Sequence, residues 1–126
     1  MQVLGKVADA LFITKEEAYR PGSCFGAGML MGGACSAITG SFIAIGIKYG
    51  NYAPNDMDQK AIVNAKRMEF LKRFKEAYDG KVTCPELLKI DLMDPEKRKT
   101  AHDDGTIECA CPNFIRTALK ILKDLL

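Results

Sequence analysis

A chain of 126 residues that is 48% hydrophobic and 27% charged has the composition of an ordinary globular protein, and we expect residues 1–126 to form a single helical domain. The balance of 18 Lys and Arg against 16 Asp and Glu leaves a net charge of +2, which is too small to indicate nucleic-acid or membrane-surface binding. Trp is absent, so platforms for stacking bases have little support and we predict no nucleic-acid partner.

The amino-terminal segment predicts two short helices. Apolar residues between Val3 and Leu11 recur at helical spacing. Thr14 followed by Glu17 is the capping-box pattern that begins a second helix, which we expect Arg20 and Pro21 to end. The segment has no basic region followed by an apolar run and a cleavage site, so we predict a cytoplasmic protein.

The next stretch, Pro21–Ile47, carries no charge and holds seven of the chain's 11 glycines. Between Gly22 and Gly33 the glycines disfavour a long regular helix and favour close approach of backbone to a ligand or to another segment. Residues 34–49 are typical of a buried apolar helix that Gly50 ends in a left-handed conformation. The helical part is too short to cross a bilayer, so we predict a core helix and no membrane span.

The second half of the chain carries further helix signals. Asn55 or Asp56 begins the longest predicted helix, which runs to about Asp79. Thr83 or Cys84 caps a short helix that has Pro85 in its first turn, and Asp94-Pro95-Glu96 repeats the pattern.

The polar segment from Lys97 to Gly105 contains His102, which we interpret as a loop residue because a metal site needs three or four ligands. Cys111 is predicted to cap the final helix, with Pro112 in its first turn. No alternating strand pattern occurs, so the predicted fold is all-α, a compact helical bundle around the buried helix at residues 34–49.

Three of the five cysteines stand at predicted helix starts: Cys35, Cys84 and Cys111. The positive end of a helix dipole stabilises the thiolate, which is the form that attacks disulfides and binds metals. In a reducing cytosol such residues are thiols, metal ligands or partners in a transient disulfide. No C-x-x-C pair is present, and Cys109 with Cys111 forms only a C-x-C pair.

The segments Gly32–Gly40, Ile45–Gly50 and Cys84–Leu88, together with Cys111, resemble the C-GCAxxG-C-C family of redox proteins. The resemblance implies a small helical protein with a redox or metal role. It matches Cys35 to the cysteine of a Cys-Gly-Ala-x-x-Gly motif, with Ala37 and Gly40 as companions, and Cys84 and Cys111 to the two later cysteines. Ser36 stands where that motif has glycine.

The family's first cysteine lies further upstream, where this chain has none, and Cys24 is the candidate to replace it. Gly32 and Gly33 then belong to a glycine-rich cover over the thiols.

Three hypotheses follow. In the first, Cys35, Cys84 and Cys111, with Cys109 or Cys24, converge in a pocket and catalyse thiol–disulfide exchange with a redox partner protein. In the second, Cys35, Cys84, Cys109 and Cys111 bind zinc or an iron–sulfur cluster. In the third, the glycine-rich face and its methionines form a binding or assembly module, which includes a homo-oligomer.

Overall fold

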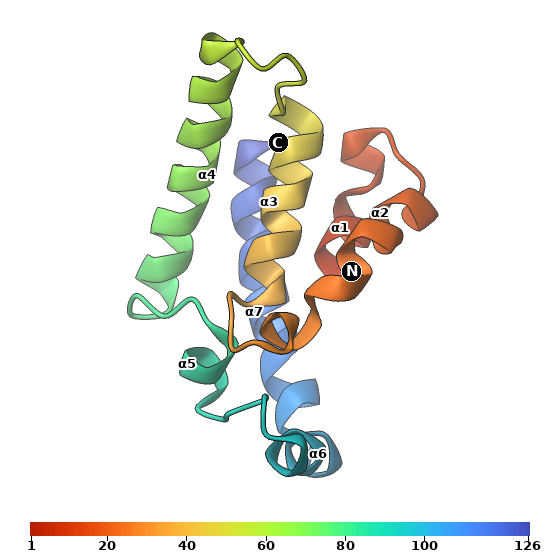
Figure 1. The fold of residues 1–126 in the computed structure, drawn as a ribbon, viewed down its shortest axis with the longest axis vertical. Coiled ribbons are helices and arrows are strands. Elements are labelled where there is room, and N and C mark those ends of the chain that lie inside the picture. The colour runs from red at the N-terminus through yellow and green to blue at the C-terminus, as the bar shows by residue number, and fades with distance from the viewer.

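The computed structural model describes residues 1–126 and contains helices but no strands, which confirms the all-α prediction (Figure 1). Seven α-helices and two 3₁₀ segments follow one another along the chain. Their bounds are α1 Gln2–Val7, η1 Asp9–Leu11, α2 Lys15–Gly22, η2 Ser23–Leu30, α3 Ser36–Tyr49, α4 Met57–Ala77, α5 Cys84–Leu88, α6 Pro95–Asp103 and α7 Thr106–Leu125.

Helix α3 is the central element of the bundle, as predicted. It contacts α1, η1, η2, α4 and α7 (Figure 1). Its buried residues are Ala37, Ile38, Gly40, Ser41, Ala44 and Ile45. The buried Ser41 hydroxyl donates to the Ala37 carbonyl at 2.7 Å, which satisfies the one polar side chain in the core. The helix thus supplies a fixed central axis whose first turn lies beside the thiols described below.

The ends of α3 differ from the prediction. The helix begins at Ser36, so Cys35 is the residue that precedes its first turn. Gly50 was expected to be left-handed, but it is extended, with φ −61° and ψ 141°. Its N–H donates to the Gly46 carbonyl at 2.7 Å, so the helix ends without a left-handed turn.

An aromatic column joins α3, α4 and α7. Neighbouring ring centroids along the column lie 4.9–6.0 Å apart, in the order Phe42, Phe70, Phe74, Tyr78 and Phe114. The Tyr78 hydroxyl lies 2.8 Å from the Thr117 hydroxyl, so its polar end has a partner. Aromatic contacts of this kind add about 0.5–1.5 kcal/mol each to the burial of the rings. The column fixes α4 and α7 against α3, and its last ring, Phe114, reaches the thiol pocket.

Two helix boundaries near prolines were predicted wrongly. Helix α2 has the predicted capping box at Thr14 but continues through Pro21 to Gly22. Pro21 lacks an N–H, and the Glu17 carbonyl that it cannot bond belongs to an exposed residue that water can reach.

Helix α7 begins at Thr106 after a left-handed Gly105, not at Cys111. The Asp104 carboxylate accepts hydrogen bonds from the backbone and side chain of Thr106, and these hold the turn that starts the helix. Cys111 and Pro112 therefore lie inside α7.

Residues 95–103 form α6, so the interpretation of His102 as a loop residue was wrong as well. The Asp94 carboxylate accepts from the N–H groups of Glu96 and Lys97 and caps this helix, as the Asp-Pro-Glu pattern predicted. No helix in the structure is both long enough and apolar enough to span a membrane.

Candidate functional site

Two backbone hydrogen bonds bring Cys35 and Cys84 together, although 49 positions separate them in the sequence. The Cys35 N–H donates to the Val82 carbonyl at 2.8 Å, and the Cys84 N–H donates to the Gly33 carbonyl at 3.1 Å. These bonds flank an isolated antiparallel bridge between Ala34 and Thr83. Because these bonds join backbone groups, they hold the two segments together without using the thiols themselves.

Each of the two cysteines stands at the start of a helix, as predicted. Cys35 precedes α3 as its N-cap residue and makes no side-chain cap hydrogen bond. Cys84 is the first residue of α5, and the backbone N–H of Ser36 at the start of α3 lowers the pKa of the Cys84 thiol. Unpaired N–H groups at a helix start stabilise negative charge, so this position favours ionisation of Cys84.

A capping box holds the start of α5. The Glu86 N–H donates to the Thr83 hydroxyl at 3.4 Å, while the Glu86 carboxylate accepts from the Thr83 N–H at 3.0 Å and from the Val82 N–H at 3.2 Å. The same carboxylate accepts from the Thr83 hydroxyl at 2.8 Å. These bonds lower the pKa of Glu86. Glu86 therefore fixes the turn that carries Cys84.

The glycine-rich segment covers the site by close backbone packing. A Cβ atom on Gly28 would lie only 2.7 Å from the Gly33 carbonyl oxygen, and the Gly33 N–H donates to the Gly28 carbonyl at 3.0 Å. Residues 27–30 all have φ between 52° and 62°, which makes one left-handed turn. This confirms the predicted close approach of the glycine-rich backbone. Gly28 approaches another backbone segment, at Gly33.

The remaining supporting residues occupy separate places. Gly32 has φ +65° and lies near Pro85 and Met93. Ala37 lines the pocket, and Gly40 packs against Val3 of α1.

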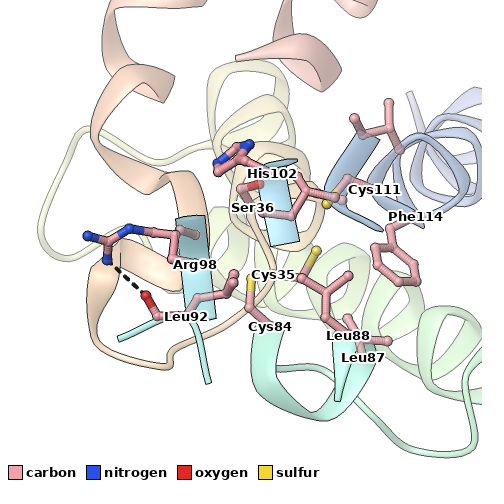
Figure 2. Close-up of a pocket in the computed structure, with 14 residues that line it drawn as sticks. Cys35, Ser36, Cys84, Leu87, Leu88, Leu92, Arg98, His102, Cys111 and Phe114 are labelled. Carbon is pink, nitrogen blue, oxygen red and sulfur yellow. Dashed lines mark hydrogen bonds between the residues drawn. The ribbon is translucent and has the colours of Figure 1, made fainter. Parts of the chain in front are cut away.

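The thiols face a pocket with a volume of about 140 Å³. Figure 2 shows the sulfur atoms of Cys35, Cys84 and Cys111 directed into the same space. The pocket is mostly apolar and is lined by Ala27, Cys35, Ser36, Ala37, Cys84, Leu87, Leu88, Leu92, Arg98, His102, Ile107, Cys111, Phe114 and Ile115. The structure therefore brings together the three cysteines that were predicted to act together.

The two paired thiols differ in acidity. Interaction with the Cys35 thiol lowers the pKa of Cys84, and the Ser36 N–H adds to this effect, while burial and the charge of Cys111 oppose it. Interaction with Cys84 raises the pKa of Cys35 far above its ordinary value, and burial raises it further. The pair titrates as a unit in which Cys84 loses its proton first and Cys35 keeps its own.

Cys111 reaches the pocket from the interior of α7. It is half-buried, whereas Cys35 and Cys84 are only 5% and 6% exposed. Burial raises the pKa of the Cys111 thiol, and the charge of Glu108 raises it further. Cys111 lacks the helix-start position that was predicted for it.

The other two cysteines lie outside the pocket. Cys24 and Cys109 are exposed, and all five cysteines are free thiols in the structure. The Cys24 sulfur lies 3.9 Å from the Ser23 hydroxyl in η2. No three His, Cys, Asp or Glu side chains are placed to hold a metal ion together. The structure thus does not gather the four cysteines that the metal hypothesis requires.

Two polar residues of the pocket were missed in the sequence. Arg98 and His102 are four residues apart on α6 and therefore share one face of the helix. Arg98 donates from Nη1 to the Leu92 carbonyl at 2.9 Å, and His102 Nδ1 lies 3.0 Å from the Glu108 carboxylate. The bond to His102 lowers the pKa of Glu108. The predicted helix start at Asp94-Pro95 could have indicated this, because a helix that continues from it to residue 102 places Arg98 and His102 on one face.

The fold and the pocket define a class: an all-helical protein with a buried dithiol held between two helix starts. The model of one protein family matches residues 1–125, and that family is described as "Putative redox-active protein (C_GCAxxG_C_C)". The chain belongs to this family, which confirms the resemblance seen in the sequence. The comparisons with curated proteins and with solved structures found no match.

Proposed function

We propose that this protein carries out thiol–disulfide exchange with Cys84 as the attacking thiol and Cys35 as the resolving thiol. The observation that carries the proposal is the backbone bridge that places these two thiols at the starts of α3 and α5, in one pocket. The lowered pKa of Cys84 and the raised pKa of Cys35 support this division of roles.

The exchange would take place in two steps. The Cys84 thiolate attacks one sulfur of a substrate disulfide, which breaks the S–S bond and releases one thiolate that takes up a proton. Cys35 then loses its proton and attacks the Cys84 sulfur, forming the Cys35–Cys84 disulfide and releasing the second thiol. Two electrons and two protons pass from the dithiol to the substrate.

Cys111 would share the pocket with this pair as a neutral thiol. Its pKa is raised whereas that of Cys84 is lowered, so Cys84 ionises first. In a reducing compartment the resting state is the dithiol, and a thiol donor would restore it after each turnover.

Equilibration in buffers of reduced and oxidised dithiothreitol tests the proposal. We expect one two-electron transition in which Cys35 and Cys84 are lost as free thiols together, with the disulfide mapped by mass spectrometry. A Cys24→Ser, Cys109→Ser double variant is the control and should show the same transition. When Cys35→Ser is treated with an acyclic disulfide such as hydroxyethyl disulfide, a mixed disulfide should accumulate on Cys84.

The proposal fails if Cys35 and Cys84 stay reduced across the whole range of buffers. Metal analysis of anaerobically purified protein belongs to the same experiment. Stoichiometric metal that blocks both thiols from oxidation would favour the metal hypothesis instead.

A further inference from the structure

The two paired thiols are shielded from large molecules. Cys35 and Cys84 are 5% and 6% exposed, and Ala27 of the glycine-rich segment lines their pocket together with Leu87 and Leu88 of α5. A thiolate must reach the substrate sulfur in line with the bond that breaks. A disulfide in a folded protein carries its own chain around both sulfurs, so it cannot approach Cys84 in this way.

The pocket that leads to the thiols admits a small group. Its volume of about 140 Å³ is close to that of an engineered cavity of roughly 150 Å³ that binds benzene. The pocket adjoins a more open one of about 330 Å³, and both are lined by Ser36, Ile107, Cys111 and Ile115. One arm of a small disulfide fits the inner pocket, and the open pocket offers room for the second arm.

The lining favours an uncharged arm. Eleven of the 14 lining residues are hydrophobic. Two of the three polar residues are engaged elsewhere: Arg98 is turned away from the sulfurs toward the Leu92 carbonyl (Figure 2), and His102 pairs with Glu108. The third, Ser36, offers only a neutral hydroxyl. A charged arm would lose its water without gaining a charged partner, which is unfavourable.

We propose, on the basis of the thiol–disulfide function above, that the substrates are low-molecular-weight disulfides with short, uncharged arms. The dithiol and one such disulfide react to give the Cys35–Cys84 disulfide and two molecules of the free thiol. The reverse reaction, with the same thiols as reductant, regenerates the dithiol. From the sequence we expected a redox partner protein, and this proposal replaces that protein with a small-molecule disulfide.

Competition among disulfides of different size and charge tests the substrate class. The reduced protein is treated separately with hydroxyethyl disulfide, cystamine, glutathione disulfide and insulin, and the rate of Cys35–Cys84 disulfide formation is measured by mass spectrometry. The exposed Cys24 and Cys109 of the same molecules give the intrinsic reactivity of each reagent. Relative to these thiols, we expect hydroxyethyl disulfide to oxidise the pair at least about tenfold faster than the other three.

Two variants test the role of the pocket. Ile115→Phe fills the wall shared by the two pockets and should slow the reaction with hydroxyethyl disulfide without changing the rates at Cys24 and Cys109. Leu88→Ala enlarges the pocket and should raise the relative rate with glutathione disulfide. Circular dichroism and thermal unfolding establish that each variant is folded.

Equal relative rates for all four disulfides would overturn the substrate class and leave the exchange function intact. A failure of every disulfide to form the Cys35–Cys84 bond would instead overturn the exchange function.

Discussion

The capping box at Thr83 controls how often Cys84 becomes accessible. Thr83→Ala removes the hydroxyl that accepts from the Glu86 N–H and donates to the Glu86 carboxylate. Loss of such a cap costs about 1 kcal/mol. Helix α5 has only five residues, so losing the cap lowers the free energy needed to open the turn that carries Cys84. A change of 1 kcal/mol raises the population of the open form about fivefold, since RT is about 0.59 kcal/mol.

The assay is alkylation of Cys84 by a fluorescein-linked iodoacetamide, a reagent too large for the pocket of about 140 Å³ and therefore dependent on opening, under native conditions, followed by peptide mass spectrometry. We expect the Cys84 rate to rise about fivefold in Thr83→Ala, in proportion to the open population. The chain offers a matched control, because Thr14 and Glu17 form the same capping box at the start of α2. Thr14→Ala should lose a similar amount of stability without changing the alkylation of Cys84.

Two outcomes would refute this reasoning. An unchanged Cys84 rate in Thr83→Ala would show that opening of α5 does not limit access. Equal increases in both variants would show that Cys84 is reached by opening of the whole molecule.

Three further predictions follow from the site and the core. Cys35→Ala should raise the pKa of Cys84, because it removes the neighbouring thiol that lowers this pKa; the ultraviolet absorbance of the thiolate against pH measures it, and an unchanged curve would contradict the assignment. Oxidation to the Cys35–Cys84 disulfide closes a loop of about 50 residues and should raise the free energy of unfolding by about 4 kcal/mol, measured by urea denaturation with Cys84→Ser as the control that cannot respond. Phe70→Ala, at a fully buried ring, should cost about 3–5 kcal/mol in the same assay, whereas Met68→Ala, 60% exposed, should change stability by less than about 0.5 kcal/mol.

Local signals in the sequence predicted most of the helix starts. Thr14, Thr83 and Asp94 carry short-range hydrogen bonds within three residues, so a pattern of a few letters contains the whole interaction. The central helix was predicted from its uncharged apolar run for a similar reason. Gly50 was assigned wrongly because a glycine after a helix permits a left-handed turn without requiring one.

The prediction for Cys111 failed because two start signals competed. Cys111-Pro112 has the form of a helix start, but Asp104, Gly105 and Thr106 form an earlier start whose side-chain bonds hold it in place. Once α7 has begun, Pro112 costs one backbone hydrogen bond, because it has no N–H to donate to the carbonyl of Glu108. Glu108 is exposed, so water can reach this carbonyl. Local propensity could not decide between a helix start at Cys111 and one at Thr106. The earlier start lengthens α7, which allows it to pack against α6.

The grouping of the thiols could be predicted only as a hypothesis, because the bonds that produce it join distant segments. The bridge between Ala34 and Thr83 uses backbone groups that every residue carries, so no side-chain pattern marks it. The position of α6, which brings Arg98 and His102 to the pocket, is likewise set by contact with α7. The sequence marks this bridge only by its glycines, which allow the backbone of residue 33 to approach residues 28 and 84.

Burial and reactivity have separate origins in this site. If exposure alone determined reactivity, Cys24 and Cys109 would react before any other thiol, and with reagents of any size. The bridge instead places Cys84 beside the Cys35 thiol and the Ser36 N–H, which lower its pKa while the pocket keeps it 6% exposed. Because the bridge fixes both groups next to Cys84, this thiol can stay nucleophilic inside an apolar pocket that would otherwise keep it protonated. Selectivity for small substrates and activation of the thiol can therefore coexist at one residue.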